Sequence, residues 1–139
     1  MSACTPSLAD FLDLSRRGNL VPVFREILAD TETPVSAFLK TTRGEHAFLL
    51  ESVVGGDKWG RYSFLGSEPS AVFASRGTTV SLAEHGKPLR TYETADPLDA
   101  LRAILAGYRA VPVAGLPRFF GGAVGYVAYD AVRFFERLP

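Results

Sequence analysis

Five short β-favouring segments fill the middle of the chain and constrain its fold more than any other feature. Each is a run of apolar or alternating residues between turn signals, at a spacing typical of an antiparallel sheet. Arg76-Gly77 and His85-Gly86 are predicted hairpin corners, because glycine accepts the positive φ that tight turns require. The predicted strands cover residues 46–53, 61–66, 71–76, 78–84 and 88–92.

Helices are predicted on both sides of these strands. Ser7 can cap the first helix, with Asp10 placed to complete a capping box, and the Gly-Asn pair at 18–19 ends it. Thr33 can cap a second helix that has proline at its first position. Asp96 or the following proline opens a third helix, whose apolar residues recur at helical spacing.

The order of these elements predicts an α+β protein. Residues 19–28 are expected to be extended, 119–129 to form an apolar strand interrupted by glycines, and 130–139 to open a further short helix. Because the strands group in the middle and the helices near the ends, we expect an antiparallel sheet or sandwich with about three flanking helices. A chain of 139 residues fits a single domain, 1–139.

Composition excludes several classes of partner and compartment. Fifteen basic and fifteen acidic residues cancel, so no net field attracts nucleic acid or an anionic membrane. No apolar run approaches the roughly 20 residues of a membrane helix, and the first residues lack a secretory leader pattern. The single cysteine, Cys4, can form no internal disulfide. A cytoplasmic protein is therefore expected.

Residue patterns for catalysis are sparse. The two histidines, His46 and His85, lie at predicted turns, which argues against a serine or cysteine nucleophile with a histidine base. No spacing of His, Cys or carboxylates fits a metal site. The glycines at 121, 122 and 125 lack the Lys-Ser/Thr of a phosphate loop. A basic and aromatic cluster at 58–62 suits a nucleic-acid surface, but the zero net charge argues against it.

Glu51 and Ser52 stand out because they follow the apolar Phe48, Leu49 and Leu50 at the end of a predicted strand. A carboxylate is costly to bury there unless a group of opposite charge pairs with it. Together the two side chains could bind the charged groups of a small zwitterion. Alternatively, Ser52 caps the turn and Glu51 pairs with Arg61, which the residues alone favour.

Three separated stretches, taken together, resemble one protein family. They are "NLVPVFREI" at 19–27, "FLLESVVGGDKWGRYSFLG" at 48–66 and "LPRFFGGAVGYVAYDAVRFFERLP" at 116–139. In these motifs, their order and their intervals, the chain closely resembles the N-terminal region of anthranilate synthase component I, the large subunit. The resemblance extends from about residue 14 to the last residue.

This resemblance implies a reaction and its partners. In that family the large subunit is a lyase that converts chorismate to anthranilate and pyruvate, with Mg²⁺ and with ammonia from a glutamine amidotransferase subunit, component II. The reaction is the first committed step of tryptophan biosynthesis, and L-tryptophan inhibits it allosterically. The catalytic and magnesium-binding residues belong to a C-terminal domain that would begin beyond residue 139, so the chain alone is expected not to be catalytic.

Carried over by residue, the resemblance assigns an L-tryptophan effector site. The "LLES" box implies contacts from Leu50, Glu51 and Ser52, and the proline of "LVPV", Pro22, lies near the same pocket. Arg61 is a further neighbour. Glu51 would face the ammonium group, whereas Leu50 and Pro22 would face the indole ring. Part of the pocket would come from the C-terminal half, so the chain alone should bind tryptophan weakly or not at all.

Three other interpretations stay open. The corresponding region of aminodeoxychorismate synthase, the folate-pathway relative, has a similar architecture. The chain could also be a free-standing amino-acid-binding module, or a structural domain that docks the amidotransferase subunit.

Overall fold

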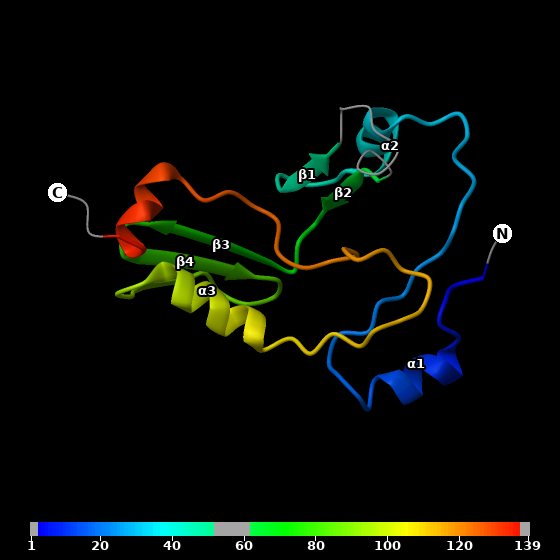
Figure 1. Cartoon of the computed structure of the whole chain (residues 1–139), viewed down its shortest axis with the longest axis horizontal. Helices are drawn as coiled ribbons and strands as arrows, with labels where there is room; N and C mark the ends of the chain where they lie inside the picture. Colours follow the sequence, from blue (N-terminus) through cyan, green and yellow to red (C-terminus); the bar gives the residue numbers. More distant parts are fainter. Residues whose placement is uncertain (1–2, 52–61, 137–139) are drawn as a thin grey trace. The chain divides into compact units, whose positions relative to one another are not determined.

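The computed structural model describes residues 3–51 and 62–136, which divide into two compact units. The first unit comprises Met1–Leu28, Ser75–Val80 and Tyr92–Pro139, and the second comprises Ala29–Ala74 and Ser81–Thr91. The positions of the two units relative to one another are not determined (Figure 1). Each unit is therefore described by itself, and the expectation of one domain stays a prediction.

The described residues form an α+β protein, as predicted. In chain order the elements are α1 (Leu8–Leu14), α2 (Pro34–Thr41), β1 (Ala47–Leu50), β2 (Phe64–Ser67), β3 (Ala71–Arg76), β4 (Thr79–Glu84), β5 (Arg90–Glu93), α3 (Pro97–Ala106) and the 3₁₀-helix η1 (Tyr129–Phe134). All five predicted strands are present, although residues 52, 53 and 61 of the predicted ranges lie outside the described residues.

In the second unit, β1 and β2 form an antiparallel pair that α2 contacts. Their register places Phe48 opposite Gly66 and Leu50 opposite Phe64. A Cβ on Gly66 would lie only 2.6 Å from the Phe48 ring, so the ring covers the glycine. This arrangement fills the gap that a glycine leaves in a strand.

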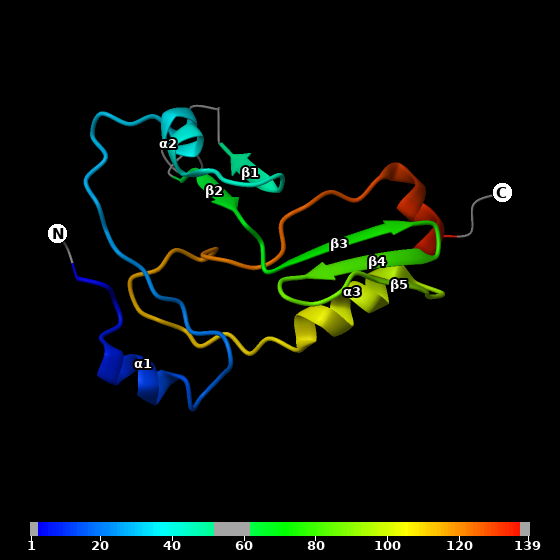
Figure 2. The ribbon, with the colours of Figure 1, turned by 180° about the vertical axis from the view of Figure 1, so that it is seen from behind.

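The other three strands form a sheet in the order β3-β4-β5. Both ribbon views show β3 and β4 side by side and running in opposite directions (Figures 1 and 2). Gly77 and Gly86, at the two connections, have φ of 57° and 73°. Both predicted hairpin corners are therefore confirmed. Glycine occupies them because a side chain at these positive φ values would be strained.

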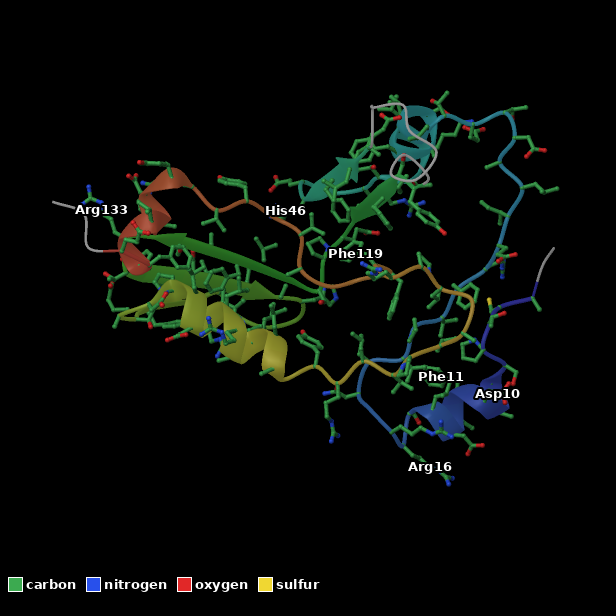
Figure 3. The ribbon with its side chains drawn as sticks, in the orientation of Figure 1. Asp10, Phe11, Arg16, His46, Phe119 and Arg133 are labelled. Atoms are coloured by element: carbon green, nitrogen blue, oxygen red, sulfur yellow. The ribbon has the colours of Figure 1, made fainter. Side chains whose placement is uncertain are left out.

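The helix N-termini use the caps that the sequence predicts. The Ser7 hydroxyl accepts a hydrogen bond from the backbone N–H of Asp10 at 3.2 Å, as predicted, but the Asp10 carboxylate accepts from this hydroxyl at 2.6 Å, which is not the backbone bond of the predicted capping box. Figure 3 shows Asp10 on α1. Thr33 forms a capping box with Ser36 at the start of α2. The Asp96 carboxylate accepts from the backbone of α3 at 2.8 Å, which satisfies a donor that the helix leaves free.

Burial is concentrated in few side chains. Val80, Leu82 and Val111 are buried apolar residues, and Pro97 at the start of α3 is buried as well. Many large apolar side chains of the described residues are exposed, including Leu28 at 93% and Tyr126 at 94%.

The predicted strand at 119–129 is wrong. The described residues of this segment form bends and irregular backbone up to Tyr129, where η1 begins. Gly122 has a φ of 137°, which departs from strand geometry, and glycines contribute no side chain to pack on a sheet. The short helix predicted from residue 130 is present as η1, although its last three predicted residues lie outside the described ones.

Candidate functional site

The predicted effector residues lie in both units. Leu50 is the last residue of β1 and is 48% exposed, and Glu51 follows it directly and is exposed. Both belong to the second unit, whereas Pro22 is a half-buried residue of the first. Ser52 and Arg61 lie outside the described residues. The structure therefore places Leu50 and Glu51 together and leaves their relation to the other three residues untested.

Leu50 and Glu51 lie at the end of the β1–β2 pair from which the chain continues into residues 52–61. Leu50 is opposite Phe64, the first residue of β2, and residues opposite one another share a face of a sheet. The rings of Tyr62 and Phe64 are stacked, with centroids 6.1 Å apart and planes inclined by 28°. We call these four residues, Leu50, Glu51, Tyr62 and Phe64, the loop end.

The loop end combines an apolar wall with a negative charge. Leu50 and Tyr62 are about half exposed, at 48% and 49%, so their apolar surfaces are available for contact. The exposed Glu51 carboxylate can accept hydrogen bonds from a cation such as an ammonium group. Leu50 and the aromatic pair thus offer apolar surface, and Glu51 offers an acceptor for a cation at the same strand end.

Tyr62 and Phe64 were not among the sequence-predicted effector residues. In the sequence, Tyr62 belongs to the basic and aromatic cluster at 58–62, whose composition suits a nucleic-acid surface. Their spacing could have predicted them, because residues at positions i and i+2 of a strand, such as the two aromatic residues of "GRYSF", point to the same face. The contribution of Phe64 also depends on the register with Leu50, which the motif does not reveal.

Pro22 lies between two backbone bridges of the first unit. Leu20 forms a parallel bridge with Ala110, and Phe24 forms an antiparallel bridge with Thr5. The predicted extended conformation of this segment is thus present as isolated bridges. Pro22 itself donates no hydrogen bond, which suits a position between paired residues.

Three surface glutamates have lowered pKa values because of hydrogen bonds to their carboxylates. A hydrogen bond from Lys40, with a second from Ser36, lowers the pKa of Glu32, and Lys87 lowers the pKa of Glu84. The Thr79 hydroxyl lowers the pKa of Glu93 by donating to its carboxylate. These groups belong to hydrogen bonds and ion pairs at the surface.

Residues 3–51 and 62–136 contain neither a metal-binding cluster nor a membrane-spanning helix. No group of three or more His, Cys, Asp or Glu side chains there could hold a metal ion. No helix in the same ranges has the length and apolar character needed to cross a membrane. His46, which directly precedes β1 in Figure 3, and His85, in the turn after β4, are both exposed.

Comparison with known proteins connects these features to one family. The chain is 43% identical over 131 residues to anthranilate synthase component 1 of Aquifex aeolicus, an alignment that covers 94% of the chain and 26% of the relative. It is 44% identical over 139 residues to the Mycolicibacterium smegmatis protein of the same name, covering 97% and 26%. The Pseudomonas putida protein of that name is 41% identical over 129 residues, covering 92% and 26%.

The chain spans about a quarter of the length of these curated relatives. No protein-family model matches it, and no solved structure does. The similarity extends over almost the whole chain and agrees with the motifs at 19–27, 48–66 and 116–139. In sequence the chain is therefore a homologue of the N-terminal region of anthranilate synthase component 1.

Proposed function

We propose that this chain is the N-terminal regulatory region of an anthranilate synthase large subunit. The complete enzyme would convert chorismate and ammonia, released from glutamine, to anthranilate and pyruvate in tryptophan biosynthesis. The observation that carries the proposal is the identity of 41–44% to proteins of that name over 92–97% of the chain. The reaction is that of the whole protein, of which this chain matches about a quarter.

The proposed role of the chain within that enzyme is to bind the feedback inhibitor L-tryptophan. Glu51 would accept hydrogen bonds from the ammonium group, with Ser52 beside it and Arg61 returning nearby. Leu50 and Pro22 would contact the indole ring. The exposed Glu51 and the half-exposed Leu50 that precedes it support this role, and the stacked Tyr62 and Phe64 add aromatic surface at the same strand end.

Catalysis, magnesium and ammonia delivery are assigned to other parts of the assembly. Following the resemblance to the large subunit, we assign Mg²⁺ to the C-terminal catalytic domain. The chain alone would then form no anthranilate. The glutamine amidotransferase subunit and the C-terminal domain are the proposed protein partners, in the cytoplasm, with no role for nucleic acid or membrane.

The test is feedback inhibition of the complete gene product. Glu51→Gln keeps the shape of the side chain and removes its charge, so the L-tryptophan concentration for half-inhibition should rise about tenfold, equivalent to roughly 1.4 kcal/mol. Glu45→Gln is the matched control, because Glu45 is an exposed glutamate that precedes the opposite end of β1. Anthranilate fluorescence measures the activity.

Three outcomes would contradict the proposal in different ways. Formation of aminodeoxychorismate in place of anthranilate would reassign the enzyme to folate synthesis. An uninhibited wild-type enzyme would remove the effector role. Equal inhibition constants for Glu51→Gln, Glu45→Gln and the wild type would show that Glu51 does not contact the effector.

A further inference from the structure

The segment before Pro22 is joined to the residues after α3 by a dense set of backbone hydrogen bonds. The N–H groups of Asn19 and Leu20 both donate to the Arg109 carbonyl at 3.2 Å, and the N–H of Val111 donates to the Leu20 carbonyl at 2.9 Å. We call the contact between residues 18–20 and 107–111 the Asn19 junction. It lies entirely within the first unit.

The Asn19 side chain closes this junction with two more hydrogen bonds. Its Nδ2 donates to the Gly107 carbonyl at 2.7 Å, and its Oδ1 accepts from the backbone N–H of Arg109 at 2.6 Å. These bonds join residues 88 and 90 positions apart in the sequence. The amide thus satisfies one backbone acceptor and one backbone donor where α3 has ended, as asparagine with both groups can.

The backbones approach closely because residue 18 is glycine. A Cβ at Gly18 would lie 2.3 Å from the Arg109 carbonyl oxygen and 2.7 Å from Cγ2 of Val111. Gly18 and Val111 are both buried. The junction is therefore a specific, tightly packed contact of the fold.

The Asn19 junction holds one side of Pro22, and the Thr5–Phe24 bridge holds the other. The latter has two hydrogen bonds of 2.8 Å between the backbones of Thr5 and Phe24. Pro22 lies two residues from each bridge, on a segment fixed at both ends. A binding residue held in this way loses little conformational freedom when its ligand arrives, which favours affinity.

We propose that Asn19 is a positioning residue that sets the affinity for the aromatic amino-acid effector by holding Pro22 in place. The inference rests on the proposed function, since it requires Pro22 to contact the effector. Asn19 acts through the backbone and does not itself touch the ligand. Because its side chain is exposed, Asn19→Ala leaves backbone groups that water can reach, and the protein should still fold.

The experiment compares Asn19→Ala with Asp96→Ala in the complete gene product. Asp96→Ala removes the single cap hydrogen bond at the start of α3, so it should also reduce stability, but it leaves the Asn19 junction intact. For Asn19→Ala the L-tryptophan concentration for half-inhibition should rise about fivefold to tenfold, or roughly 1 to 1.4 kcal/mol. Asp96→Ala should keep the wild-type value and the wild-type turnover.

Thermal unfolding of both variants separates affinity from stability. A rise in half-inhibition concentration for Asn19→Ala alone, at a similar loss of melting temperature, supports the inference. An equal rise of the half-inhibition concentration in both variants, or no rise in either, overturns the inference. The proposed function still stands in that case, provided that L-tryptophan inhibits the wild-type enzyme. A wild-type enzyme that tryptophan does not inhibit overturns both.

Discussion

The Asn19 junction and the loop end are built from different interactions. The junction consists of backbone hydrogen bonds around the buried Gly18, together with the two bonds of the Asn19 amide. The loop end consists of exposed side chains: Leu50 is 48% exposed and Tyr62 is 49% exposed. A substitution in the junction should therefore act on stability and, through the position of Pro22, indirectly on binding, whereas one at the loop end should act directly on what the surface binds.

Gly18→Ala should have the largest effect. The new methyl group would lie 2.3 Å from the Arg109 carbonyl oxygen, and a backbone atom cannot move aside as the tip of a side chain can. We expect a loss of about 3 kcal/mol in the free energy of unfolding, measured by urea denaturation. Gly121→Ala is the control, because a Cβ there would meet no atom within 4 Å.

The contrast between these two glycines decides the outcome. Gly121→Ala should change the free energy of unfolding by no more than about 0.5 kcal/mol, as is usual for surface substitutions. If Gly18→Ala were equally mild, the close approach of the two backbones would not exist in solution. The junction would then provide no rigid support for Pro22.

Gly66→Ala should have a smaller effect, because its neighbour can move. The new Cβ would lie 2.6 Å from the edge of the Phe48 ring, and the ring can rotate away at the cost of its packing. We expect a loss of about 1 to 2 kcal/mol, again from urea denaturation. Together with Phe48→Leu this gives a double-mutant cycle, since the smaller side chain relieves the clash.

The sign of the coupling tests the β1–β2 register. Gly66→Ala should cost less stability in the Phe48→Leu background than in the wild type. Additive effects would mean that Phe48 does not cover Gly66. In that case the register that also pairs Leu50 with Phe64 would be incorrect, and the apolar wall of the loop end with it.

Local features of the fold could be predicted from the sequence, whereas contacts between distant segments could not. The caps Ser7 and Thr33 and the turn glycine Gly77 act within a few residues, so their identity is enough to place them. The Asn19 junction joins positions about 90 residues apart, and no local pattern specifies that partner. The sequence therefore predicts Asn19 as the end of a helix and the start of an extended segment, without its partners at 107–111.

Because the sequence does not specify contacts between distant segments, it wrongly predicts a strand at 119–129 and identifies only part of the loop end. An apolar segment becomes a strand only when another strand pairs with it, and sequence alone does not reveal the partner. Leu50 and Glu51 were placed at a strand end because the apolar run stops there. The stacking of Tyr62 on Phe64 and the pairing of Phe64 with Leu50 required the β1–β2 register.

The smallest effect on stability is expected for a surface ion pair. Its interaction is electrostatic, unlike the backbone hydrogen bonds of the Asn19 junction and the side-chain surface of the loop end. Glu84 lies 2.9 Å from Lys87 and 2.7 Å from Arg90. The hydrogen bond from Lys87 lowers the pKa of Glu84 below the ordinary glutamate value of 4.5. Arg90 also lowers this pKa, whereas partial burial of the carboxyl group opposes the shift. NMR titration of the carboxyl carbon should therefore give a midpoint below 4.5, and Lys87→Met should raise it.

The lowered pKa fixes the direction of the pH dependence. Because the folded state binds the proton less tightly than the unfolded state, the pair contributes stability above pH 4.5 and loses it as the pH falls through the lowered pKa. Since the pair is exposed, added salt should move the midpoint back toward 4.5. A midpoint unchanged by Lys87→Met would show that Lys87 is not the cause. Backbone hydrogen bonds and the close packing at Gly18 have no such titration, so acid should loosen the β4–β5 turn before the Asn19 junction.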